Sequence, residues 1–135
     1  MIICCEKLLP EIVRIYTNED WTQIGDFDRL DYLLDDCIEK NEKIVVLFSN
    51  PNEFDPDEGI SFPPLHMLMR IIARLLAVRH KLKDAVHFNV IHLQDENARN
   101  SVNTVLQYYT PANKTHVVES KAEIAAIIND KSNYT

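Results

Sequence analysis

Apolar residues gather in short runs that alternate with longer stretches of helical spacing along most of the chain. Four of the short runs have the length and composition of β-strands, at residues 11–16, 43–48, 87–93 and 115–119. Each is followed by a stretch whose apolar residues recur every three or four positions, as on one side of an α-helix. Because strands that alternate with helices are joined by crossover connections, the pattern predicts an α/β domain with parallel strands.

A further extended run, residues 2–7, precedes the first of these strands, and Pro10 lies between the two. Proline has no N–H group to donate, so it marks a turn rather than the interior of a sheet. We therefore expect the two runs to form an antiparallel hairpin that opens a mixed sheet, with the parallel strands following it.

About four helices are expected. The clearest spans residues 28–40, where the apolar positions follow an i, i+3, i+4, i+7, i+8 pattern: Leu30, Leu33, Leu34, Cys37 and Ile38. A second helix is expected at 65–79, and a third follows residues 94–96 and ends at Thr110-Pro111. A short last helix begins after Ser120, with Glu123 at the spacing of a capping box.

The helix expected at 65–79 is apolar on more than one side. One row contains Leu65, Leu68, Met69, Ile72, Leu75 and Leu76. A second row contains Met67, Ile71 and Val78. Since one row is enough for packing on a sheet, we expect the second row, with Phe62 and Arg74, to form a partner or dimer surface. The acidic, proline-containing loop at 49–60 precedes this surface.

Composition and charge limit the classes of function. The chain has 135 residues and a formal net charge of −7, with 46% apolar residues. This length predicts a single domain, 1–130, followed by a flexible tail at 131–135. The acidic balance argues against nucleic acid as a partner, because phosphate contacts need a basic surface. No apolar stretch is long enough for a transmembrane segment. The three cysteines, Cys4, Cys5 and Cys37, suit buried thiols in a reducing cytoplasm.

The sequence contains none of the familiar catalytic or cofactor motifs. The five histidines are dispersed, and neither HExxH nor CxxC is present, so we expect no bound metal. With two glycines there is no phosphate-binding loop, so we expect no nucleotide and no other cofactor. Ser49 follows a buried strand, as some nucleophiles do, yet it lacks a GxSxG elbow. We therefore expect a protein without enzymatic activity.

The order strand–strand–helix–strand–helix–strand–helix–strand–helix resembles that of the STAS domains, the family of bacterial anti-sigma-factor antagonists, and of their SpoIIAA-like relatives. Residues 41–49 (NEKIVVLFS) resemble the central strand of the family, and residues 65–78 resemble its long second helix. Residues 107–128 (QYYTPANKTHVVESKAEIAAII) are similar to the SpoIIAA-like ending, in which a TPA-type turn precedes a strand and a short Ala-rich helix. The resemblance covers essentially the whole chain and concerns topology more than chemistry.

The resemblance implies a regulatory module that acts through protein–protein contact and has no catalysis of its own. In the antagonist branch, a Ser or Thr at the start of the second helix is phosphorylated, but Pro63 and Pro64 stand where that residue and the following glycine would be. Ser61 lies nearby, and we expect it to act as a helix N-cap, with a phosphosite as the alternative. STAS domains share a superfamily with the lipid-binding CRAL-TRIO domains. The alternative function is therefore a carrier or sensor of a lipid or other apolar small molecule.

Overall fold

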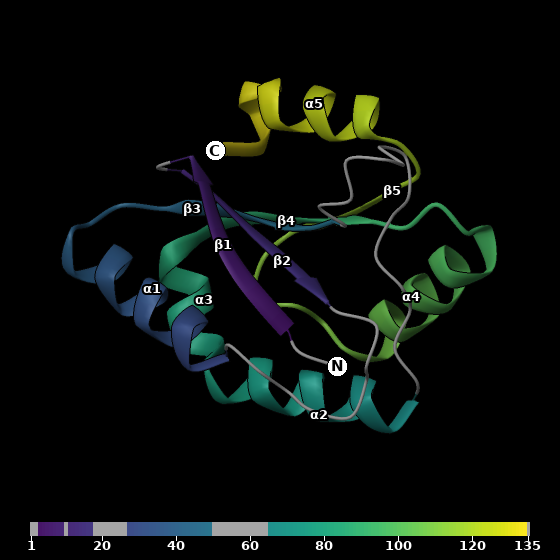
Figure 1. Cartoon of the computed structure of the whole chain (residues 1–135), viewed down its shortest axis with the longest axis horizontal. Coiled ribbons are helices and arrows are strands. Elements are labelled where there is room, and N and C mark those ends of the chain that lie inside the picture. The colour runs from purple at the N-terminus through teal and green to yellow at the C-terminus, as the bar shows by residue number, and fades with distance from the viewer. Residues whose placement is uncertain (1–2, 10, 18–26, 50–64, 135) are drawn as a thin grey trace.

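The computed structural model describes residues 3–9, 11–17, 27–49 and 65–134 (Figure 1). In chain order the elements are β1 (Ile3–Leu9), β2 (Ile12–Thr17), α1 (Phe27–Glu39), β3 (Ile44–Phe48), α2 (Leu65–Ala77), α3 (Arg79–Ala85), β4 (Val86–His92), α4 (Glu96–Tyr108), β5 (Thr115–Val118), α5 (Lys121–Asn129) and the 3₁₀ helix η1 (Lys131–Tyr134). Helices and strands alternate from β2 to α5, so the prediction of an α/β domain is confirmed.

The five described strands form one sheet in the order β1-β2-β3-β4-β5. β1 pairs with β2 in the antiparallel direction, and β2, β3, β4 and β5 are parallel. Each crossover therefore steps to the next strand in the same direction. Because such crossovers are right-handed, they put their helices on one face of the sheet. Figure 1 shows this arrangement, with α1, α2, α3 and α4 on one side of the sheet and α5 on the other.

The central strand β3 explains why the sheet is buried on both faces. Ile44, Val45, Val46 and Leu47 are all nearly inaccessible to solvent, as expected for a parallel strand between two layers. Val46 packs in a core cluster with α1 and α3, whereas Val45 and Leu47 pack in a second cluster with β4, β5 and α5. The alternation of side chains along a strand thus divides the core into two layers.

The region between β3 and β4 differs from the single helix expected at 65–79. The chain breaks at Val78, whose φ of −109° and ψ of 18° are not helical, and α3 follows as a separate helix. Lys81 on α3 lies 2.6 Å from Asp31 and 3.0 Å from Asp35, both on α1. These two ion pairs, together with the buried Leu82 and Ala85, hold α3 against α1 and the sheet.

The chain after α5 contains one further short element. Residues 131–134, in the stretch expected to be a tail, form η1. The ring of Tyr134 packs edge-on against His87 at 4.9 Å and against Phe88 at 5.2 Å between centroids. Its hydroxyl donates a hydrogen bond to the carbonyl of Ile128. η1 is therefore held on the same face of the sheet as α5.

The start of α5 agrees with the capping box read from the sequence. The Ser120 hydroxyl accepts a hydrogen bond from the N–H of Glu123, and the Glu123 carboxylate accepts one from the N–H of Ser120. Ile124, in the middle of the helix, is buried in the second core cluster. The capping box thus determines where α5 begins, and the apolar side that contains Ile124 determines how the helix packs on the sheet.

Candidate functional site: the α2 surface and the carboxyl edge of the sheet

The site residues expected from the sequence fall into two groups. Ser61, Phe62 and the side chain of Met67 lie outside the described residues, as does most of the loop at 49–60. Ile71 and Val78 are partly buried and pack against the core cluster formed with α1 and α3. Ile71 and Val78, which we expected to face a partner, therefore face the core instead. Arg74 is exposed.

A different apolar row faces outward. Met69 is 64% exposed and Leu76 is 49% exposed. These residues are seven positions apart, so they lie on the same side of α2, and Ile72 and Ala73 lie between them. The core-facing row is formed by Ile71, Leu75 and Val78. α2 thus has one apolar row on the core and a second on the outside of the domain, which we call the outer row of α2: Met69, Ile72, Ala73 and Leu76.

The two exposed helices of this layer have opposite charge. α2 has no acidic residue, and helical spacing puts Arg70 and Arg74 on a third side of the helix, between the outer row and the core-facing row. On α1, the exposed or partly exposed residues Tyr32, Asp35, Asp36 and Glu39 lie at i, i+3, i+4 and i+7, which also forms one stripe. The Lys40 ammonium lies 3.1 Å from the Asp36 carboxylate and Lys81 lies 3.0 Å from Asp35, so two of the three carboxylates of the stripe are paired with lysines. The domain thus presents an apolar row on α2 and, on α1, a stripe that combines Tyr32 with carboxylates.

A small apolar cavity lies beneath α2. Its volume is about 90 Å³, and the residues that line it include Phe48, Leu75, Leu106 and Tyr109. Burial raises the pKa of the Tyr109 hydroxyl, and Arg79 opposes this rise as a nearby cation and hydrogen-bond partner. Sites for drug-sized ligands usually have volumes of roughly 300–1,000 Å³. A lipid would therefore require α2 to move away from the sheet.

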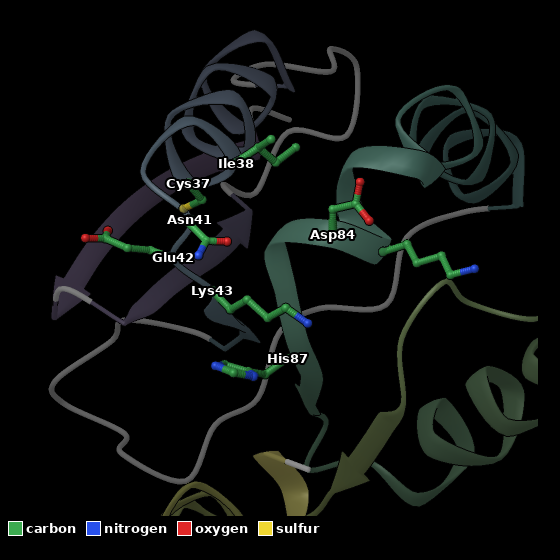
Figure 2. Close-up of a pocket in the computed structure, with 8 residues that line it drawn as sticks. Cys37, Ile38, Asn41, Glu42, Lys43, Asp84 and His87 are labelled. Carbon is green, nitrogen blue, oxygen red and sulfur yellow. The ribbon is translucent and has the colours of Figure 1, made fainter.

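A larger hollow, of about 670 Å³, lies at the opposite edge from the strands' carboxyl ends. Figure 2 shows Lys43 and His87 pointing into the same space, with Asp84 on the α3 wall and the Glu42 carboxylate turned away. Burial, followed by the positive charge of Lys43, lowers the pKa of His87. The hollow lies where α1 and α3 end, and helix carboxyl ends attract cations such as Lys43. Its mixed charges suit bound water and ions better than an apolar ligand.

The carboxyl edge of the sheet, where α/β folds usually bind ligands, holds two buried polar side chains. Among the described residues, only Ser49 and His92 are polar and almost fully buried, at 2% and 0% exposure. Ser49 follows β3 and His92 ends β4. The register pairs Phe48 with Ile91, so the next residues along, Ser49 and His92, come side by side. Sequence reasoning had considered Ser49 alone, because the adjacency depends on strand register.

The helix N-termini at this edge are already occupied by side chains of the chain itself. The Asp95 carboxylate accepts a hydrogen bond from the N–H of Ala98 at 3.0 Å and caps α4. At α5 the Ser120 hydroxyl accepts from the N–H of Glu123, and the Glu123 carboxylate accepts from the N–H groups of Glu119 and Ser120. Arg99 donates to the carbonyl of Leu93 at 2.8 Å and lies 3.8 Å from the Glu119 carboxylate. Because carboxylates fill the positions that would attract an anion, neither of these N-termini suits a phosphate group.

Two further findings concern the described residues only. No three His, Cys, Asp or Glu side chains in this part of the chain come together as metal ligands. None of its helices combines the length and apolar character needed to span a membrane.

Comparison of the chain with protein-family models, with curated proteins and with solved structures found no match.

Proposed function

We propose that this domain is a STAS-like regulatory module that binds protein partners and acts without catalysis of its own. The observation that carries the proposal is the outer row of α2, where Met69 and Leu76 are exposed although the opposite side of the helix already packs on the core. An exposed apolar surface of this kind stabilises nothing within the domain and typically marks a site of protein contact. The order of strands and helices, on which the family resemblance rests, supports the same function.

The partner that we propose is a second copy of the chain. The outer row of α2 is apolar, and the exposed stripe of α1 includes Tyr32, which is 69% exposed. Packing α1 of one copy against α2 of the other would bury Tyr32 of one copy and the outer row of the other. A two-fold axis would form this contact twice, once in each direction.

The test compares two rows of one helix. Leu76→Glu puts a charge in the outer row, and we expect it to dissociate the dimer while changing the free energy of unfolding by no more than about 0.5 kcal/mol. Ile71→Asp puts a charge in the core-facing row, and we expect it to destabilise the fold itself by about 2 kcal/mol or more. Sedimentation velocity reports the association state, and urea unfolding reports the stability.

Tyr108→Glu is the matched control, because Tyr108 is also a large exposed side chain but lies on α4. It should leave the dimer intact. A wild-type protein that sediments as a monomer at high concentration would exclude the homodimer. A Leu76→Glu variant that unfolds as readily as Ile71→Asp would show that the outer row is part of the core.

The alternative is a carrier of a lipid or other apolar small molecule. The cavity under α2 provides an apolar lining for it, but a volume of about 90 Å³ is too small unless the helix moves. Native mass spectrometry distinguishes the two functions, because a carrier would retain a bound ligand and an interaction module would not. Both proposals concern a protein of the cytoplasm.

A further inference from the structure

The buried pair Ser49 and His92 has no role in protein contact through α2, because it lies on the other face of the sheet. Leu47 and Val90 belong to the core cluster beneath α5, and side chains two residues further along a strand point to the same face. Ser49 and His92 therefore both point toward the α5 side, at the carboxyl ends of neighbouring parallel strands.

The hydrogen bond of His92 determines where its proton is. Nε2 lies 3.2 Å from the backbone carbonyl of Glu119. A carbonyl oxygen only accepts hydrogen bonds, so the neutral ring carries its hydrogen on Nε2 and has a lone pair on Nδ1. Nδ1 is buried and has no hydrogen-bond partner in the structure. Buried polar atoms are nearly always paired, so an unpaired acceptor at this edge requires an explanation.

The orientation of the His92 ring offers an explanation for the unpaired Nδ1. Nε2 reaches toward Glu119, which follows β5 on one side of β4. Ser49 follows β3, on the opposite side of β4 from Glu119, so the register puts Ser49 on the side of His92 away from its bonded nitrogen. A histidine that is oriented through one nitrogen and has a lone pair on the other, beside a serine, has the components of a nucleophile–base pair.

We propose that Ser49 is an acceptor of acyl groups and that His92 is its general base. The Ser49 oxygen attacks the carbonyl carbon of a small activated ester, and the hydroxyl proton moves to Nδ1 of His92. The carbon–oxygen bond to the leaving group then breaks, and the leaving alkoxide takes the proton from Nδ1. The product is an acyl ester of Ser49 and a free alcohol, with neutral His92 restored. The reaction stops there, so the chain is modified once and turns over no substrate. The step requires the Ser49 hydroxyl to turn toward Nδ1, which has no hydrogen-bond partner in the resting structure.

The test uses diisopropyl fluorophosphate, which labels activated serines: an oxygen–phosphorus bond forms, fluoride leaves, and the proton moves to Nδ1. We expect peptide mass spectrometry of the folded protein to find the label on Ser49. Ser49→Ala should remove it. His92→Gln should reduce the labelling rate roughly 100-fold or more, because general bases contribute at least that factor. Glutamine retains an N–H to donate to Glu119 and removes only the base.

Ser120→Ala is the matched control, since Ser120 is used in capping, and labelling should be unchanged. If His92→Gln fails to fold, the wild-type protein in urea replaces it, and unfolding should abolish labelling of Ser49. An absence of label on Ser49 in the folded protein would overturn the proposal. Equal labelling rates in the wild type and in folded His92→Gln, or in folded and unfolded protein, would overturn it as well.

Discussion

The two faces of the sheet differ in what covers them and in what they bury. Four helices, α1 to α4, cover one face, and the polar side chains described there, such as Asn89 and Thr115, are only partly buried. Among the described elements, α5 and η1 cover the other face. That face carries both of the almost fully buried polar residues, Ser49 and His92, and also the partly buried His116.

The difference follows from topology. Sequential right-handed crossovers must place their helices on the same face. Strand order alone therefore produces the layer of α1 to α4, which we call the thick layer. Among the described elements, the opposite face is covered by α5 and η1, which follow the last strand. These two short helices form what we call the thin layer. We infer that a partner binds to the outside of the thick layer, at the outer row of α2. The buried polar side chains Ser49 and His92 lie instead beneath the thin layer.

The largest expected effect tests whether the thin layer is as well packed as the thick one. Phe88 is fully buried on the α5 face, and Leu34 is fully buried on the other face. Phe88→Ala should lower the free energy of unfolding by about 3–5 kcal/mol, and Leu34→Ala by about 2–5 kcal/mol. Urea unfolding of both variants measures the two losses. A Phe88→Ala loss below about 1 kcal/mol would mean that the α5 face contributes little to the fold.

The elements whose side chains follow a single periodic pattern could be predicted from the sequence. Leu30, Leu34 and Cys37 of α1 are buried as their spacing predicts, because the acidic residues between them leave only one apolar side. The continuous apolar run of β3 likewise predicted burial on both faces. The capping box of Ser120 and Glu123 depends on residues three positions apart and was therefore also predictable.

The rest depends on contacts between distant residues. α2 has its polar residues Arg70 and Arg74 on one narrow side and apolar residues on the others, so spacing leaves two apolar rows as candidates for the core. Ile71 and Val78, predicted to face a partner, face the core instead. η1 lacks a periodic pattern and is fixed by the contact of Tyr134 with Phe88, which is 46 positions earlier in the chain. The pairing of Ser49 with His92 requires the register of β3 on β4. None of these could be read from local spacing.

A smaller effect tests how the thin layer is anchored. Ser120→Ala removes the side-chain acceptor of the Glu123 N–H and should cost about 1 kcal/mol. Ser101 is the matched control, because its hydroxyl donates to the carbonyl of Asn97 within α4 and caps nothing. Ser101→Ala should change the free energy of unfolding by less than about 0.5 kcal/mol. Equal losses in the two variants, measured by urea unfolding, would show that the capping box does not hold α5.

The smallest expected effect concerns the pH dependence of the same layer. His87 packs against Tyr134 and His116 packs against Phe88, at 4.9 Å and 5.7 Å between ring centroids. Burial lowers the pKa of both histidines below 6.5, and the cations Lys43 and Lys114 lower it further. Glu11 opposes the shift at His87, and a hydrogen bond to Asn133 and the charge of Asp130 oppose it at His116.

The sign of the effect follows from proton binding. Between the lowered pKa of the folded state and the ordinary value of 6.5, the unfolded chain binds more protons than the folded one. The stabilisation is therefore fully present above about pH 6.5 and decreases as the pH falls below it. Urea midpoints at pH 7.5 and 5.5 should differ in the wild type, and the double variant His87→Phe, His116→Phe should reduce this difference. The exposed His80→Gln serves as the control and should retain the wild-type difference. If the double variant retains it too, the histidines beneath η1 are not the groups that titrate, and the thin layer is no more sensitive to acid than the thick one.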